Sequence, residues 1–458
     1  MAARAKYDAR HRPEAVASLV LHRCHDRLVL SAFKCLSQVS SNWRETALDH
    51  PVYWRDVCIR STTTASLSLA RHRLEAGRHR PWILTLELPS AEGTIALTKL
   101  LRPAIPFVKG ITVYVNVRDV TTDLWSIFHV PVPELERFDV FASVQTDQSL
   151  PSLPQDLFSG VAPRLRDVTL QDVALPEGAV DAFSLVTSAT LRSPPSAWER
   201  FPYQLFTIFP RIQSLTMAGG CVDFCGPIPK AVERGFGSLQ FLDIDFYAGE
   251  ALKFMQSLPV QRIPQMLVAF PDDYTALAAL QHLQCQQYEV VILSTCYPEF
   301  RINFRHGQWN GDDRYAPFRM FAEHVDDYTS DDPQLNILFK QPELSRRVLS
   351  LLLATSLWPT IAPLMQPLPA VTSLTVIIDN AQDMRAQMPL QPLPCPALQV
   401  LRLESLGGFV RALANDVVAL VPRIRTSHRL KLELEDVAVD DPTSILPLHF
   451  ISVQSVTN

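Results

Sequence analysis

The segment from Leu239 to Phe246 reads LQFLDIDF and fits the frame L-x-x-L-x-L. Apolar side chains alternate with aspartates along its second half, which is the pattern of a β-strand with one buried face. The frame returns in five further segments, at Leu135-Phe138-Val140, Leu165-Val168-Leu170, Ile212-Leu215-Met217, Val371-Leu374-Val376 and Leu398-Leu401-Leu403. This recurrence predicts a chain built from stacked strand repeats.

The spacing of these frames indicates the kind of repeat. Their middle residues step by 27 from Leu374 to Leu401 and by 30 from Phe138 to Val168, close to the period of roughly 20–29 residues found in leucine-rich repeats. A clean strand, ITVYVNV, occupies 111–117, and weaker strands are expected near Leu191, Leu267 and Ile292. We therefore expect an α/β repeat fold over 81–458: a degenerate leucine-rich-repeat solenoid, with a curved parallel sheet and helices or irregular turns outside it. An unrelated α/β or sandwich domain is the alternative.

One stretch interrupts the repeats. The range 301–341 contains HGQWNGDDRYAPFRM and EHVDDYTSDDPQ, which are rich in aspartate, aromatic and turn residues. The Asp-x-Asp-x-Asp-Gly spacing of a calcium loop, with its distal Glu, is missing. We therefore expect an inserted, solvated acidic loop at about 301–341 and no metal site.

Composition and motifs narrow the functional classes. Lys plus Arg is 42 and Asp plus Glu is 47, so the net charge is 42 − 47 = −5, which disfavours nucleic acid as a partner. The chain has 36 Pro and 15 Gly, and it contains neither a dinucleotide-binding nor a phosphate-binding glycine motif. No esterase elbow, kinase signature or zinc-protease motif occurs either. We expect no catalytic residue, no metal and no cofactor.

The expected location is intracellular, in the cytoplasm, the nucleus or both. Eight cysteines in 458 residues give no dense disulfide framework, and the N-terminal residues lack the apolar core of a secretory signal. The uncharged stretch Val348–Ile378 is interrupted by prolines, among them Pro359 and Pro363, so its helical pieces are too short to span a bilayer. We expect no membrane partner.

The N-terminal region has a helical pattern. Pro13 suits a first helical position, and Val16, Leu19 and Val20 then fall on one face. A second apolar stripe ends at Val39, and a third helix begins near Asn42. We expect a three-helix module over 1–60, joined by a connecting helix or linker at 61–80.

This module resembles a known family. Residues 12–24, RPEAVASLVLHRC, and residues 36–54, LSQVSSNWRETALDHPVYW, are similar to the F-box, especially the F-box-like proteins of fungi. The second half carries the family pattern at Leu36, Val39, Trp43, Arg44, Ala47, Leu48, Pro51 and Trp54. His11 and Arg12 stand where the family has Leu-Pro. Many F-box proteins place leucine-rich repeats after this module, so the two parts of the chain agree with each other.

The resemblance implies a non-enzymatic substrate-recognition subunit of an SCF-type cullin–RING ubiquitin ligase. The N-terminal helices would dock on the Skp-family adaptor and, through it, on a cullin, using Pro13, Glu14, Val16, Leu19, Val20, Leu36 and Val39. The repeats would hold a protein substrate, which the sequence does not identify. Strand residues between the apolar frame positions would contact it, including Asp167, Thr169, Phe241, Asp243, Asp245, Arg402 and Glu404.

Two other functions stay open. The substituted His11-Arg12 favours a leucine-rich-repeat interaction scaffold whose eroded F-box has no role in ubiquitin ligation. An enzyme whose active site arises from loops and leaves no linear motif is the second alternative, because function resides in sites rather than in folds.

Overall fold

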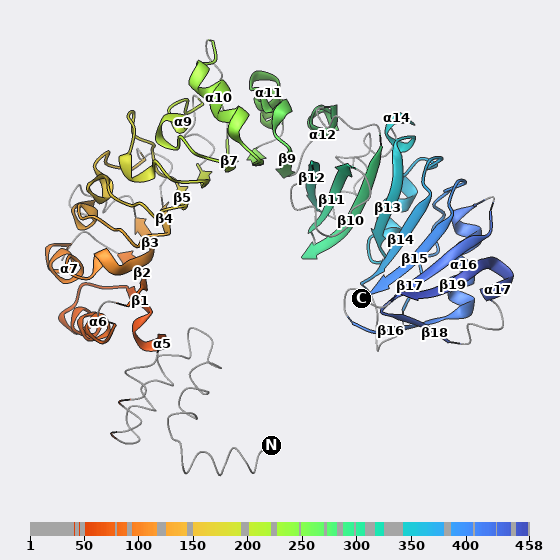
Figure 1. Cartoon of the computed structure of the whole chain (residues 1–458), viewed down its shortest axis with the longest axis horizontal. Coiled ribbons are helices and arrows are strands. Elements are labelled where there is room, and N and C mark those ends of the chain that lie inside the picture. The colour runs from red at the N-terminus through yellow and green to blue at the C-terminus, as the bar shows by residue number, and fades with distance from the viewer. Residues whose placement is uncertain are drawn as a thin grey trace. The chain divides into compact units, whose positions relative to one another are not determined.

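The chain is organised around parallel β-strands that alternate with helices and short helical turns (Figure 1). The computed structural model describes residues 41, 45, 51–77, 80–88, 94–116, 125–143, 150–193, 201–220, 227–246, 249–269, 273–281, 287–296, 299–306, 317–324, 342–379, 386–405, 408–426, 428–440 and 446–456. The described strands form one mostly parallel sheet of 17 strands and a separate parallel pair, β16 (Val410–Leu413) with β18 (Val437–Asp440).

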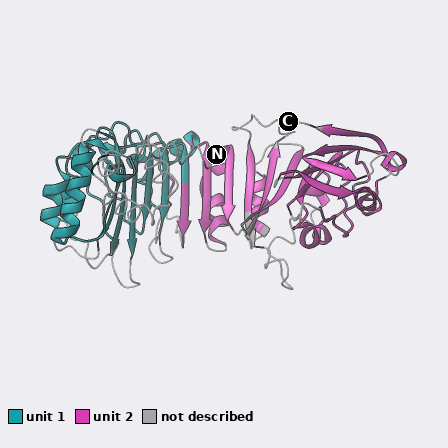
Figure 2. Cartoon of the chain, turned by 90° about the horizontal axis from the view of Figure 1, so that it is seen from below, with its two compact units in different colours: residues 1–215, 229–238 teal, residues 216–228, 239–458 magenta. Residues whose placement is uncertain are grey.

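The chain is divided into two compact units (Figure 2). Unit 1 comprises residues 1–215 and 229–238, and unit 2 comprises residues 216–228 and 239–458. The boundary falls inside β7 (Ser214–Gly219). Each unit contains stacked strands and helices of its own.

From residue 51 onward, the described part of unit 1 has a short helix and then strands that alternate with helices or turns. Its elements are α5 (Pro51–Trp54), β1 (Asp56–Ile59), α6 (Thr64–Ala76), β2 (Trp82–Leu88), α7 (Thr94–Leu101), η1 (Ile105–Phe107), β3 (Val108–Asn116), η3 (Ser126–Phe128), β4 (Arg137–Ser143), η4 (Leu157–Gly160), β5 (Asp167–Gln171), η5 (Asp181–Phe183), β6 (Ser188–Arg192), α9 (Leu205–Ile208) and α10 (Lys230–Ser238). The strands β1 to β6 pair in sequence order, each parallel to the next.

The register of these strands follows the frame read from the sequence. Ile111, Phe138 and Val168 are Cα partners across β3, β4 and β5, and all three are buried. The regular spacing of the frame therefore produces a row of stacked core residues. This is expected when each repeat covers the apolar face of the next repeat. The strand predicted near Leu191 is confirmed as β6.

Aromatic rings fill the space between the unit 1 strands and the short turns that replace helices. Phe138 lies 5.1 Å from Phe158 and 6.1 Å from Phe128, centroid to centroid, with the rings in edge contact. Phe158 has a φ of 56°, in the left-handed region that phenylalanine rarely adopts. Burial of its ring in this cluster offsets the cost of that backbone conformation.

Unit 2 continues the same architecture. Its elements are β8 (Phe241–Phe246), α11 (Glu250–Ser257), η6 (Val260–Arg262), β9 (Gln265–Ala269), α12 (Asp273–Gln281), β10 (Tyr288–Cys296), β11 (Glu299–His306), β12 (Phe318–His324), α14 (Pro342–Ser345), β13 (Val348–Ala354), α15 (Trp358–Ile361), η8 (Ala362–Leu364), β14 (Ser373–Ile378), β15 (Val400–Ser405), β16, α16 (Ala414–Ile424), β17 (Leu430–Glu435), β18, α17 (Leu446–His449) and β19 (Phe450–Val456). The strands predicted near Leu267 and Ile292 are confirmed as β9 and β10. Leu374 and Leu401 are Cα partners, as the frame predicts.

The range 301–341 is not simply an inserted loop, contrary to the expectation. It contains most of β11 and all of β12, which run antiparallel to each other. β12 pairs in parallel with β9, and β11 pairs antiparallel with β10, which in turn pairs with β13. The insertion therefore adds two strands to the sheet between β9 and β10, so that the ladder of hydrogen bonds continues across it.

The expected boundary between the helical module and the sheet also differs from the structure. β1 (Asp56–Ile59) lies inside the predicted module 1–60 but pairs with β2. Tyr53 and Trp54 are buried, and the buried Arg73 of α6 donates to the backbone carbonyls of Tyr53 and Asp56. Among the described residues, the first strand of the unit 1 sheet therefore begins at residue 56, and the connecting segment 61–80 holds α6.

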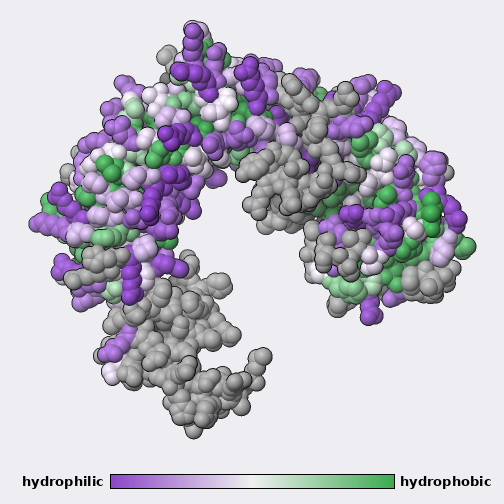
Figure 3. Space-filling model, in the orientation of Figure 1, coloured by the Kyte–Doolittle hydropathy of each residue, from purple (hydrophilic) through white to green (hydrophobic). Residues whose placement is uncertain are grey.

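The helices that cover the strands are amphipathic. In α10, Val232 and Phe236 are buried while Lys230, Glu233 and Arg234 are exposed, and its outer surface is hydrophilic (Figure 3). This spacing of i and i+4 apolar residues is what a helix needs to cover a sheet on one side. The opposite side of the strands is left without a helical layer in the described repeats of unit 1 (Figure 1).

Candidate functional site

The candidate binding surface is the open face of the strands, meaning the face that points away from the core. Along β5, Val168 and Leu170 are buried, Asp167 is exposed and Thr169 is half-buried. The other predicted contact residues show the same alternation: Phe241, Asp243, Arg402 and Glu404 are half-buried and Asp245 is exposed. All seven occupy open-face positions, as predicted. Asp167 and Thr169 belong to unit 1, and the other five to unit 2.

A polar row crosses the open face of unit 1. Thr112, Asp139 and Thr169 are Cα partners on β3, β4 and β5. The Asp139 side chain is buried although it lies on this face. Its Oδ2 accepts hydrogen bonds from Arg137 Nε at 2.7 Å and Thr112 Oγ1 at 3.3 Å, whereas its Oδ1 has no partner within the described residues. A polar row held by its own side chains gives this surface a defined hydrogen-bonding pattern.

An aromatic pair lies next to this row. Tyr114 and Phe141 are Cα partners whose rings stack at 5.0 Å with an interplanar angle of 14°, and Tyr114 is 44% exposed. Exposed aromatic rings on a fixed scaffold are typical anchors of protein interfaces. The sequence reasoning missed this pair, although the alternation in ITVYVNV places Tyr114 on the open face.

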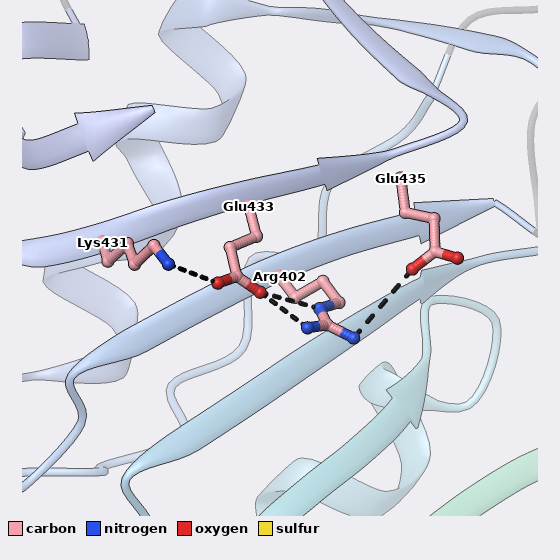
Figure 4. A network of polar contacts seen from close by, with 4 residues as sticks. All are labelled: Arg402, Lys431, Glu433 and Glu435. Atoms are coloured by element: carbon pink, nitrogen blue, oxygen red, sulfur yellow. Dashed lines mark hydrogen bonds and ion pairs between the residues drawn. The ribbon is translucent and has the colours of Figure 1, made fainter. Parts of the chain in front are cut away.

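In unit 2, ion pairs tie β15 to β17 (Figure 4). Arg402 Nε and Nη2 donate to Glu433 Oε2 at 3.0 Å and 2.7 Å, and Lys431 Nζ lies 2.8 Å from Glu433 Oε1. Arg402 Nη1 also lies 4.0 Å from Glu435. Arg402 was predicted to contact a substrate, but its guanidinium is engaged within the protein. The Arg402 side chain is only 39% exposed, so a substrate could contact only the exposed part of this ion-paired side chain.

Two carboxylates of this region have pKa values shifted in opposite directions. Hydrogen bonds from Lys431 and Arg402 lower the pKa of Glu433 despite its burial. Burial raises the pKa of Glu404, and repulsion from Glu435 raises it further. The ionised Glu433 therefore stabilises the fold, whereas the ionised Glu404 is a cost to it.

This contrast predicts opposite effects of two isosteric changes. Glu433→Gln is expected to destabilise the protein at pH 7 by about 1 kcal/mol, since partly exposed ion pairs contribute modestly. Glu404→Gln is expected to stabilise it, because the substitution removes a charge that burial and Glu435 disfavour. The gain should be only a few tenths of a kcal/mol, because solvent screens the half-buried carboxylate. Thermal unfolding of the full chain at a series of pH values measures both.

The pH dependence distinguishes the two causes. The benefit of Glu404→Gln fades as the pH falls through the raised pKa and is gone below the ordinary value of 4.5, because the wild-type carboxyl is then protonated. The cost of Glu433→Gln is complete above 4.5 and disappears only as the pH falls through the lowered pKa. Equal effects of the two variants at pH 7 would contradict the assignment.

Within the part of the chain that the structure describes, no three His, Cys, Asp or Glu side chains are grouped so that they could hold a metal ion. Cys395 is buried, and this burial raises the pKa of its thiol to about 12, so the thiol is neutral at physiological pH. No helix among the described residues is both long and apolar enough to cross a membrane.

The predicted adaptor contacts lie outside the described residues. They are Pro13, Glu14, Val16, Leu19, Val20, Leu36 and Val39. Of the F-box-like pattern, the structure describes its end, where Pro51 begins α5 and Trp54 is buried. The Arg80 guanidinium lies over the Trp54 ring at 5.0 Å from its centroid, a cation–π contact that joins α5 to the start of the repeats.

The comparisons with known proteins leave the family open. No model of a known protein family matches the chain, and no characterised protein matches it in sequence.

Proposed function

We propose that this chain is the substrate-recognition subunit of an SCF-type cullin–RING ubiquitin ligase. Its N-terminal helices would bind a Skp-family adaptor, and the open face of its parallel sheet would bind a protein substrate. The observation that carries the proposal is the F-box-like sequence at 36–54, followed directly by a sheet of stacked parallel strands.

The join between these two parts supports the proposal. Trp54 is both the last residue of the F-box-like pattern and a buried residue of unit 1. A receptor must present its substrate at a defined place relative to the ligase, and continuity between the adaptor-binding segment and the sheet serves that purpose. A mobile linker would weaken this coupling.

The open face suits a protein ligand. It combines the stacked pair Tyr114 and Phe141 with the polar row through Asp139, a mixture of aromatic anchors and fixed polar groups that is typical of protein interfaces. Parallel strands stacked in this way present an extended surface rather than an enclosed pocket, and such surfaces are used for macromolecular partners.

The alternative is an interaction scaffold that acts outside ubiquitin ligation. It is favoured by His11 and Arg12, which replace the apolar opening of the F-box pattern. In that case the repeats would still bind a protein, and the N-terminal segment would not bind the adaptor.

Co-purification with the Skp-family adaptor and a cullin at physiological salt tests the proposal. We expect wild type to bind, whereas Leu19→Asp should weaken adaptor binding roughly 100-fold because it puts a charge into an apolar docking face. Ile95→Asp is the matched control, since Ile95 on α7 is 73% exposed and outside the F-box-like segment.

A deletion of residues 1–50 should also abolish binding. The cut precedes Pro51 because Tyr53, Trp54 and Val57 are buried in unit 1, and removing them would damage the fold. If wild type fails to bind the adaptor, or if Leu19→Asp and wild type bind alike, the scaffold explanation replaces the receptor.

A further inference from the structure

A pocket opens between α6 and α7 in unit 1. Its volume is about 430 Å³, and its apolar lining includes Leu74 of α6, Leu100 of α7, Trp82 and Phe107. The two helices pack against each other on the outer side of β1 to β3 (Figure 1). The pocket is therefore on the helical side of unit 1 and does not belong to the open face.

The local sequence explains why this space is not filled. Gly77 ends α6, where its N–H donates to the Arg73 carbonyl at 3.0 Å, and Pro103 prevents α7 from continuing. Neither residue nor the small Ala104 has a side chain that could fill the gap. The Trp82 indole N–H donates to the Ala104 carbonyl at 3.2 Å, and this bond fixes the ring as one wall.

Charged groups also line the pocket. Arg71 and Lys99 contribute two cations, and Glu75 contributes one carboxylate. Within the described residues, neither Arg71 nor Lys99 forms an ion pair, while Glu75 lies 3.9 Å from His72 Nδ1. The described lining is thus an apolar surface bordered by two cations and one carboxylate, a net positive charge.

From this combination we infer that the pocket binds a small carboxylate with an apolar body. Small-molecule sites have volumes of roughly 300–1,000 Å³, apolar walls and a few charged groups that set orientation, and this pocket has each of these features. The apolar body would lie against Trp82 and Leu100, and the carboxylate would face Lys99 and Arg71. This inference goes beyond the proposed receptor function and does not depend on it.

Isothermal titration of the full chain with two probes tests the ligand class. The probes are 4-phenylbutyrate and its neutral counterpart 4-phenylbutanol, which share the apolar body. We expect saturable binding of the carboxylate, roughly tenfold tighter than the alcohol, because two partly exposed cations each add a modest attraction. Equal affinity for the two probes, or saturable binding of neither at millimolar concentration, would overturn the inference.

Variants then locate the site. Lys99→Gln should reduce carboxylate binding severalfold and leave alcohol binding unchanged, while Arg102→Gln, just beyond α7 and outside the lining, should change neither. Ala104→Phe should fill the pocket and block both probes. Because Ala104→Phe could disturb folding, its circular dichroism is measured as well. Lys99→Gln replaces a polar surface group, so its binding result decides between the outcomes. Identical binding by Lys99→Gln and Arg102→Gln places the probes elsewhere and refutes the site.

Discussion

Replacing Phe138 with alanine is expected to destabilise unit 1 by about 3–5 kcal/mol, the range measured for removing a fully buried phenylalanine. Its ring is completely buried on β4 and contacts Phe128 of η3, Phe158 of η4 and Phe183 of η5. These turns are too short to fill the space that full helices would occupy, so one ring packs against three of them. Its loss leaves a cavity that the turns cannot close.

Phe141→Ala is the matched control for this prediction. Phe141 lies on the same strand but on the open face, where it stacks on Tyr114. Its removal should cost about 1 kcal/mol. Hydrogen exchange of the β3 to β5 amides measures both variants, and we expect exchange throughout these strands to be far faster for Phe138→Ala than for Phe141→Ala. Equal losses would mean that the ring cluster does not hold the turns to the sheet.

The strand positions could be predicted from the sequence because core side chains repeat where strands stack. Ile111, Phe138 and Val168 keep the spacing of the frame, and their register confirms it. β1 was missed because it has only four residues, DVCI, and follows a helical pattern. A strand of this length carries too few alternations to be recognised without its neighbour β2.

The strands β11 and β12 were missed for a different reason. Their surroundings are rich in aspartate and turn residues, and β12 places Arg319 at a core position between apolar residues. A charged residue at such a position breaks the alternation by which a half-buried strand is recognised. The pairing of β12 with β9 also joins residues more than 50 positions apart, as between Met266 and Arg319, which no local pattern encodes.

The candidate surface was predictable in part. The alternation of residues along β5, β8 and β15 places the predicted side chains on the open face, as the structure confirms. The Arg402 ion pair was not predictable, because it depends on the register between β15 and β17 and joins residues 31 positions apart. By contrast, Tyr114 and Phe141 occupy the same position of the frame in neighbouring repeats, so their stacking could have been inferred.

Arg319→Met is expected to destabilise unit 2 by about 2–4 kcal/mol. Arg319 is only 1% exposed, and its guanidinium donates to the carbonyls of Ala279, Pro264 and Ile263 at 3.1, 2.8 and 3.1 Å. Ala279 is in the last turn of α12, where carbonyls lack helical partners and a positive charge is favourable. One side chain thus ties the end of α12 and the start of β9 to the inserted β12.

Methionine retains much of the volume of the Arg319 side chain but makes none of its hydrogen bonds. The expected loss of stability therefore measures the cost of leaving the carbonyls without these donors. The carbonyl of Pro264 still accepts from the Phe318 N–H at 3.2 Å, whereas those of Ile263 and Ala279 lose the bonds described above. A buried carbonyl without a partner costs about 1–3 kcal/mol, which sets the size of the effect. Arg301→Met, at an exposed position on β11, is the control and should change stability by less than about 0.5 kcal/mol.

Urea unfolding of both variants, with hydrogen exchange of the α12, β9 and β12 amides, decides the role of Arg319. Selective loss of protection in these three elements would mean that the guanidinium holds the insertion in the sheet. A loss spread evenly over unit 2, or no loss at all, would mean that strand pairing alone keeps β12 beside β9. The first outcome also explains how a chain can carry two extra strands without breaking its ladder, since one buried guanidinium donates to backbone carbonyls on both sides of the junction.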